Sequence, residues 1–357
     1  MSKFSRWAKS VQHSTRQLVG DVSTVASGYR QFQSDGQTSS EAYASLRRLF
    51  RTTDGRFNDA VGGLCRCLHA KQSIDLQDSL FERASAQRAR DVGRSLGRDG
   101  VYRFTQQLPQ EYCQALLELA LRLPGRPVTL DANPVPEQRF DRRSPQTVRL
   151  QFQANDLFAH APVRQVATDP FFLAVAQEYL GFSPVQDLMA MWWSAPGDEA
   201  LQSRAAQLYH FDMDRFRFVK FFVYLTDVGP ENGPHCYVRG SHRRKPKALL
   251  REGRIGDEEM ASHYPASDLL ELTGPAGTLL AVDTRGFHKG KPLFAGDRLI
   301  FQIQFADSMF GQNYPQVQIP ASIEDSIWNR IQNHPRCYSN FEVAAPPAAS
   351  VPDRQAA

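Results

Sequence analysis

Hydrophobic residues follow two different spacings along the chain. Up to about Arg94 they recur with a spacing of about 3.6 residues, as in SEAYASLRRLF and FNDAVGGLCRCLHA, and β-branched residues are few. This spacing predicts amphipathic helices, the first with Ser39 or Ser40 as its N-cap. From Val148 onward, short β-rich runs alternate with turn residues, in TVRLQFQ, VKFFVYLTDV, GTLLAVD and RLIFQIQFADS. The pattern therefore predicts helices first and strands afterwards.

Two more helices are predicted close to these strands. The stretch RDGVYRFTQQLPQEYCQALLELALRLPG predicts a turn, a short strand, and a helix from near Pro109 to Gly125. DPFFLAVAQEYLG predicts a helix with Pro170 near its start and Gly181 after its end. Helices followed by many short strands are typical of a β-sandwich or jelly roll with a helical cover.

Three segments follow from these patterns. We expect a helical N-terminal extension over residues 1–94, a β-rich domain over residues 95–343, and a tail over residues 344–357. The tail, AAPPAASVPDRQAA, is rich in alanine and proline, so we expect it to be disordered.

The N-terminal stretch MSKFSRWAKSVQHSTRQLVG is basic and has no acidic residue before Asp21. It predicts a frayed amphipathic helix. Phe4, Trp7 and Val11 can share one helical face, so a helix in weak contact with a membrane surface and a transit peptide are the alternatives.

Charge and composition exclude several classes of protein. The formal net charge of +4 is small for 357 residues, which gives no support to nucleic-acid binding. No apolar run approaches the roughly 18 residues of a transmembrane helix. The five cysteines are odd in number and irregularly spaced, which argues against a disulfide framework and for a reducing compartment such as the cytoplasm.

Candidate chemistry lies in the segment from Gln207 to Arg243. In a strand, residues two apart point to the same side, so His210 and Asp212 can both point inward. Taken alone, this pair is equally consistent with a polar surface pair. His288, directly after the apolar run GTLLAV, can add a second imidazole. Two histidines and one carboxylate on one face of a metal are characteristic of non-haem Fe(II) oxygenases.

Arg298 begins the strand RLIFQIQFADS. Strand alternation places Arg298, Ile300, Gln302 and Gln304 on one face, and the other face is entirely apolar. Such a face predicts a polar cavity, in which a guanidinium can bind a carboxylate through two parallel hydrogen bonds. The alternative is an edge strand with one wet face.

Other polar residues near the segment have simpler interpretations. We expect Asp214 to be exposed to solvent, while His235 and His242 are equally consistent with substrate contact and with loop ordering. The basic run is more typical of a solvated face than of a site for an anionic substrate, and it comprises Arg239, Arg243, Arg244, Lys245 and Lys247.

Together, His210-x-Asp212, YLTDVGPENGPHCYVRGSHR, His288 and Arg298 resemble the phytanoyl-CoA dioxygenase (PhyH-like) family, over about Asp99 to Asp307. The resemblance implies a mainly β double-stranded β-helix (a jelly roll, cupin-like) and hydroxylation of a small-molecule substrate at carbon, with release of succinate and CO2. Fe(II), 2-oxoglutarate and O2 would be the cofactor and cosubstrates.

The resemblance also implies roles for individual residues. His210, Asp212 and His288 would bind iron, Arg298 would bind the 2-oxoglutarate carboxylate, and Arg149 would assist it. The chain departs from the family at Gly290, where relatives often carry a hydroxyl that binds the same carboxylate. Halogenation is disfavoured because the carboxylate ligand Asp212 is present.

Two other functions are consistent with the sequence. The first is a non-catalytic double-stranded β-helix that serves as a binding or scaffold protein. The second is a metal-dependent cupin of another class, such as an isomerase, which would have no use for Arg298.

Overall fold

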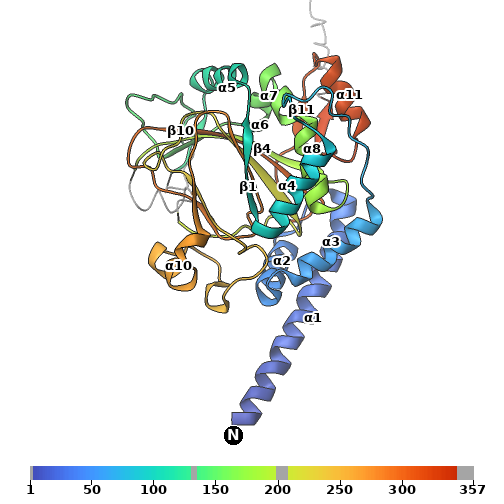
Figure 1. The fold of residues 1–357 in the computed structure, drawn as a ribbon. Helices are drawn as coiled ribbons and strands as arrows, with labels where there is room; N and C mark the ends of the chain where they lie inside the picture. The colour runs from blue at the N-terminus through green and yellow to red at the C-terminus, as the bar shows by residue number, and fades with distance from the viewer. Residues whose placement is uncertain (1–2, 130–134, 198–207, 344–357) are drawn as a thin grey trace, which may run out of the picture.

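The computed structural model describes residues 3–129, 135–197 and 208–343, with the side chains of the first helix described from residue 15 onward. A seven-stranded antiparallel sheet has the strand order β1-β8-β5-β10-β4-β3-β2, and a three-stranded antiparallel sheet has the order β7-β6-β9. A short parallel pair, β11-β12, lies beside them. Figure 1 shows the two larger sheets curving around a common interior.

The strands are β1 (Val101–Gln107), β2 (Arg126–Pro127), β3 (Arg149–Gln151), β4 (Val185–Ser194), β5 (Phe218–Tyr224), β6 (His235–Val238), β7 (Leu269–Leu272), β8 (Thr278–Val282), β9 (His288–Gly290), β10 (Arg298–Ala306), β11 (Val317–Ile319) and β12 (Phe341–Val343). The α-helices are α1 (Lys3–Asp35), α2 (Ser40–Thr53), α3 (Arg56–Leu68), α4 (Ala86–Asp99), α5 (Gln110–Arg122), α6 (Ala154–Phe158), α7 (Ala161–Ala167), α8 (Pro170–Leu180), α10 (Asp257–His263) and α11 (Asp325–Asn333).

One face of the large sheet packs into the hydrophobic core, and the other lines the interior cavity. On β10, Leu299, Phe301, Ile303 and Phe305 pack into the main core together with helix α8, which lies on the outside of the sheet. The opposite face carries Arg298, Ile300 and Gln302 toward the interior, as strand alternation predicts. Apolar residues of the small sheet, such as Tyr237, join that inner face in a second cluster. The fold is a double-stranded β-helix with a helical cover, and a cavity lined partly by polar residues lies in its interior.

Local sequence signals account for several element ends. Ser39 is the N-cap of α2, since its hydroxyl accepts a hydrogen bond from the Ala42 N–H at 3.3 Å. Pro170 begins α8, and Gly181 ends it with a φ of 87°, a left-handed conformation that glycine adopts readily. The predicted helix after Pro109 is also confirmed, although it ends at Arg122, before Gly125.

Two details of the predicted strands are wrong. TVRLQFQ forms strand only at Arg149–Gln151, although the Phe152 N–H still donates to the Met191 carbonyl at 3.0 Å, and helix α6 begins at Ala154. His210 and Asp212 do not lie in a regular strand: Tyr209 and His210 form isolated bridges, and the central strand begins at Phe218. The segment is held by scattered backbone bonds to Thr284 and His288 instead of by a continuous ladder.

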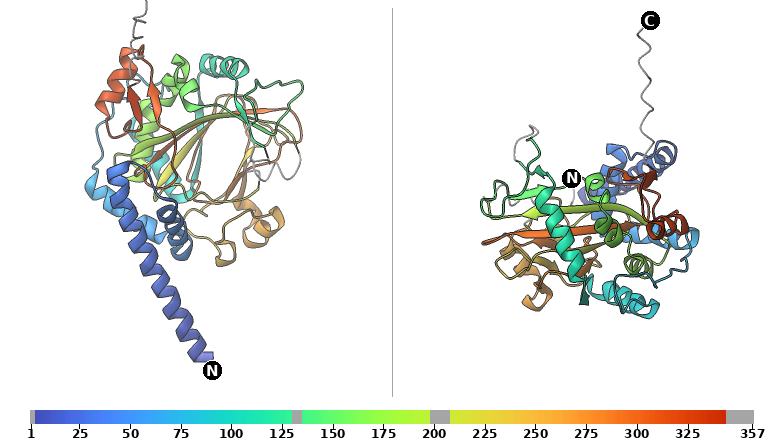
Figure 2. Two further views of the ribbon diagram at one scale, coloured as in Figure 1. Left: turned by 180° about the vertical axis from the view of Figure 1, so that it is seen from behind. Right: turned by 90° about the horizontal axis from the view of Figure 1, so that it is seen from above.

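The N-terminal helices pack against the body through their own small core. Leu18, Val25 and Phe32 of α1 lie against Phe216 and Phe310. Asp21 of α1 accepts hydrogen bonds from Arg48 of α2 at 2.6 and 3.0 Å. Figures 1 and 2 show the start of α1 projecting away from the rest of the molecule.

The division at residue 94 stays a prediction, and α4 runs continuously across it. The face formed by Phe4, Trp7 and Val11, and the tail over residues 344–357, lie outside what the structure describes. None of the helices in the described part of the chain is long and apolar enough to cross a membrane.

Deleting residues 1–33 tests whether the first helix is an appendage. We expect the melting temperature to fall, because each large apolar side chain such as Val25 contributes about 1.5–3 kcal/mol when buried. Metal binding should remain measurable, since no residue of α1 lines the central cavity. Circular dichroism melting and metal titration would check this, and loss of all soluble protein would make α1 part of the core.

Candidate active site

The three predicted metal ligands converge in the structure. His210 and His288 face each other across an isolated antiparallel bridge, with ring centroids 4.3 Å apart. Asp212 is fixed by its backbone N–H, which donates to the Thr284 carbonyl at 2.8 Å. One ligand atom from each of the three side chains lies within 4.8 Å of the others.

Backbone carbonyls orient both imidazoles. Nδ1 of His210 lies 2.9 Å from the Leu208 oxygen, and Nδ1 of His288 lies 3.0 Å from the Gly286 oxygen. Since a carbonyl oxygen only accepts, each Nδ1 carries the proton and each Nε2 has a free lone pair. The two Nε2 atoms are 3.7 and 3.5 Å from the Asp212 oxygens. This is the arrangement by which proteins orient histidines for a metal.

Burial favours the ligand form of the two histidines, and the neighbouring charges favour that of Asp212. Burial lowers the pKa of His210 to about 3, with a further contribution from His288, and it also lowers the pKa of His288. Burial alone would raise the pKa of Asp212, but Lys220 and the two imidazoles outweigh it and the pKa is lowered. Neutral imidazoles and an ionised carboxylate are the forms that bind a metal.

Lys220 is a site residue that the sequence prediction missed. Its Nζ donates to Asp212 Oδ2 at 2.7 Å and lies 3.0 Å from Asp214 Oδ2. Burial would lower the pKa of Lys220, but the two carboxylates raise it. The signal was present, because a lysine in the run FVKFFVY shares the inner face with Phe222.

Asp214 was expected to be solvent-exposed, and that expectation is wrong. Its side chain is 14% exposed, and its Oδ2 also accepts a hydrogen bond from the Tyr314 hydroxyl at 3.0 Å. Because Asp212 lies outside a regular strand, the alternation rule did not apply to its neighbours. Asp214 therefore belongs to the network that surrounds the triad, with Lys220 as the link.

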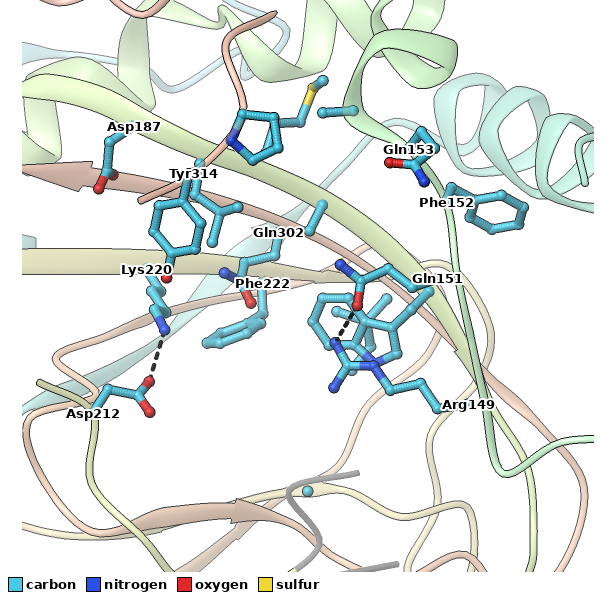
Figure 3. Close-up of a pocket in the computed structure, with 18 of the residues that line it drawn as sticks. Arg149, Gln151, Phe152, Gln153, Asp187, Asp212, Lys220, Phe222, Gln302 and Tyr314 are labelled. Atoms are coloured by element: carbon cyan, nitrogen blue, oxygen red, sulfur yellow. Dashed lines mark hydrogen bonds and ion pairs between the residues drawn. The ribbon is translucent and has the colours of Figure 1, made fainter. Parts of the chain in front are cut away.

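A cavity of about 370 Å³ extends from the triad into the sheet interior. Figure 3 shows Asp212 and Lys220 on one side of this pocket, Arg149 and Gln151 on the other, and Gln302 between them. The lining also includes His235, Gly290, Arg298 and Trp192.

Arg298 is buried with unsatisfied donors. Arg298 is 4% exposed. Its Nη2 donates a hydrogen bond to Ser194 Oγ at 3.3 Å. Nε and Nη1 have no hydrogen-bond partner among the described residues. A Cβ at Gly290 would come within 3.0 Å of Nη2, so glycine leaves room beside the guanidinium. An arginine buried with free donors requires an acceptor, which a carboxylate supplies.

Arg149 lies in the same row of the sheet. Both Arg149 on β3 and Arg298 on β10 pair with Ser194 of the strand between them. The Arg149 guanidinium stacks 4.3 Å from the Trp192 ring centroid and donates to Gln151 at 3.3 Å. Burial, and then the neighbouring Arg298, lower the pKa of Arg149 to about 10. Two buried arginines that flank the same residue, Ser194, repel each other, and a bound anion would offset that repulsion.

Of the other histidines and basic residues that the sequence singled out, one lines the cavity and the others lie elsewhere. His235 lines the cavity, while His242 packs against α4, with Nε2 3.3 Å from the Gly97 oxygen. In the basic run, Lys245 is buried, with its Nζ 5.1 Å from the centroids of Phe50 and Phe211. The other members of the run are exposed, as expected of a solvated face.

The chain was compared with known proteins. No curated protein sequence matches it. Similar solved structures include the α-ketoglutarate-dependent epimerase SnoN from nogalamycin biosynthesis, at 18% identity and a TM-score of 0.44, covering 62% of this chain and 84% of SnoN. HygX from Streptomyces hygroscopicus, with nickel, 2-oxoglutarate and hygromycin B bound, is 18% identical with a TM-score of 0.41, covering 64% and 90%. EctD from S. alaskensis in its apo form is 18% identical with a TM-score of 0.43, covering 69% and 85%.

The family comparison covers more than half of the sequence. Residues 96–296 match the sequence model described as phytanoyl-CoA dioxygenase (PhyH). This range contains His210, Asp212 and His288, and it ends just before Arg298. The chain belongs to the phytanoyl-CoA dioxygenase family.

Proposed function

We propose that the chain is an Fe(II)- and 2-oxoglutarate-dependent oxygenase that hydroxylates a small-molecule substrate at carbon and releases succinate and CO2. Fe(II), 2-oxoglutarate and O2 are the cofactor and cosubstrates of its family. The observation that carries the proposal is the meeting of two imidazole Nε2 atoms and one carboxylate at a cavity that also contains an arginine with free donors.

His210, Asp212 and His288 would hold the iron in this proposal. Their donor set, two neutral nitrogens and one carboxylate oxygen, suits Fe(II) and leaves open positions for other ligands. Bound there together with 2-oxoglutarate, the iron would supply the activation of O2, with one oxygen atom going to succinate and the other to the substrate. Lys220 holds the second oxygen of Asp212 and so fixes the orientation of the carboxylate.

Arg298, assisted by Arg149, would bind the carboxylate of 2-oxoglutarate far from the metal. Arg298 is the stronger candidate, because it is the more deeply buried and two of its donors, Nε and Nη1, lack partners in the described part of the chain, against Nε alone in Arg149. Arg149 lies one strand further out, stacked on Trp192, and adds positive charge.

Uncoupled turnover separates this proposal from a non-catalytic binding or scaffold protein. We expect purified protein with Fe(II), O2 and 2-oxoglutarate, but no substrate, to form succinate slowly. A chelator should abolish the reaction, because it removes the iron that His210, Asp212 and His288 would hold. Liquid chromatography with mass spectrometry would measure succinate. Metal binding without any formation of succinate would instead favour the scaffold function. Conversion of a small-molecule substrate in the absence of O2 and 2-oxoglutarate would favour an isomerase.

Screening small molecules for faster succinate formation would then identify substrates, and incorporation of labelled oxygen into the product would test hydroxylation.

We further propose a reducing compartment such as the cytoplasm, because all five cysteines are free thiols in the structure.

A further inference from the structure

A third histidine lies beside the proposed iron ligands. His235 is the first residue of β6, is 6% exposed and lines the central cavity. Its ring stacks near that of His288, with centroids 5.7 Å apart and an angle of 19° between the planes. Phe222 covers it from the large sheet at 5.0 Å. The imidazole is therefore held in one place by rings on two sides.

His235 carries a donor or acceptor that the protein does not use. Its Nε2 is buried and has no hydrogen-bond partner within residues 3–129, 135–197 and 208–343. Leaving a buried polar atom unpaired costs about 1–3 kcal/mol, so an unpaired atom that faces a cavity has room there for a partner, either a ligand or a water. The metal triad does not use this ring, because the ligand atoms that converge belong to His210, Asp212 and His288.

The strand register places His235 next to Arg298. On the antiparallel pair β6–β9, His235 stands directly opposite Gly290. Directly opposite residues have side chains on the same face, about 4.5–5.5 Å apart at Cβ. Gly290 has no side chain, and the Arg298 guanidinium occupies the adjoining space, 3.0 Å from where a Cβ would lie. His235 and Arg298 therefore flank the gap above Gly290.

We infer that His235 donates a hydrogen bond from Nε2 to the same carboxylate of 2-oxoglutarate that Arg298 binds, so that this end of the cosubstrate is held across Gly290. The inference rests on the proposed function. Burial keeps the pKa of His235 well below its ordinary value, so the ring is neutral. A neutral donor adds a hydrogen bond without placing a third positive charge beside Arg298 and Arg149.

A pair of substitutions separates donation from packing. His235→Leu puts an apolar side chain of similar size in place of the imidazole and so removes the donor, and we expect 2-oxoglutarate affinity to fall about tenfold to a hundredfold. His235→Gln places an amide nitrogen near the position of Nε2 and should keep most of the affinity. Titration of 2-oxoglutarate into oxygen-free, Fe(II)-loaded protein, followed by metal-to-ligand absorption, measures both. In turnover, KM for 2-oxoglutarate should rise far more than kcat falls.

Two controls make the result specific. Mn(II) affinity without cosubstrate should be unchanged in both variants, because His235 is outside the triad. His242→Gln, a substitution of a buried histidine outside the cavity, should leave 2-oxoglutarate affinity unchanged. Combining His235→Leu with Arg298→Lys should cost less than the sum of the two single losses, because both side chains act on one carboxylate.

A measurement on the unaltered protein covers the case in which the leucine variant does not fold. In Zn(II)-loaded protein with isotope-labelled histidine side chains, adding 2-oxoglutarate should shift the His235 Nε2–H resonance, identified by its loss in His235→Gln. Unchanged affinity in His235→Leu, equal losses in the leucine and glutamine variants, or an unshifted resonance would overturn the inference. Failure of the unaltered Fe(II) protein to bind 2-oxoglutarate would instead overturn the proposed function.

Discussion

Replacing Asp212 with alanine is expected to abolish succinate formation while leaving the fold intact. The substitution removes one of three converging ligands. Loss of a residue that only supports a ligand lowers metal affinity by about 10–100-fold, and loss of a ligand itself should lower it further. The fold should survive because Lys220 keeps a carboxylate partner, Asp214, at 3.0 Å, and no buried cation is left unpaired. Mn(II) titration, succinate assays and thermal melting would measure the three effects.

Asp214→Ala is the matched control. It removes a carboxylate from the same lysine, but Asp214 is outside the set of converging ligands. Its metal affinity should therefore stay well above that of Asp212→Ala, even if Tyr314 loses its hydrogen-bond partner. Full turnover in Asp212→Ala, or equal losses in both variants, would contradict the assignment of Asp212 as a ligand.

Arg298→Lys is expected to weaken 2-oxoglutarate binding about tenfold to a hundredfold, with Fe(II) affinity nearly unchanged. Lysine keeps the charge but cannot form two parallel hydrogen bonds, and one bond to a charged group contributes about 1.5–3 kcal/mol. Gly290 increases the dependence on Arg298, because the position supplies no hydroxyl for the same carboxylate. Anaerobic titration of the Fe(II)-loaded variant with 2-oxoglutarate would measure the loss.

Arg142→Lys provides the comparison outside the cavity. Arg142 forms a bidentate pair with Asp297, the residue before Arg298, and its side chain is 45% exposed. The substitution changes an arginine close in sequence to the site without touching the pocket, so cosubstrate affinity should be unchanged. If Arg298→Lys binds 2-oxoglutarate as tightly as the unaltered protein, Arg298 is structural and Arg149 becomes the leading candidate.

Local signals in the sequence were sufficient for the elements that have strong periodicity. The helix over Pro170–Leu180 has a proline at its start and a glycine after its end, and strand alternation on Arg298–Ala306 separated the core face from the pocket face. Both features depend on residues that are neighbours in the chain. Short or irregular segments were less predictable, and the stretch around His210 and Asp212 is held by distant backbone groups instead of by its own pattern.

The sequence by itself determined the helical and β-rich regions, the family and the candidate residues His210, Asp212, His288, Arg298 and Arg149. Only the tertiary structure decided which side chains meet. Lys220 reaches Asp212, and His235 stands opposite Gly290 beside Arg298, because antiparallel strands bring together residues that lie far apart along the chain. Strand pairing and burial set those contacts and leave the donors of Arg298 and His235 unpaired, and neither can be read from the local order of residues.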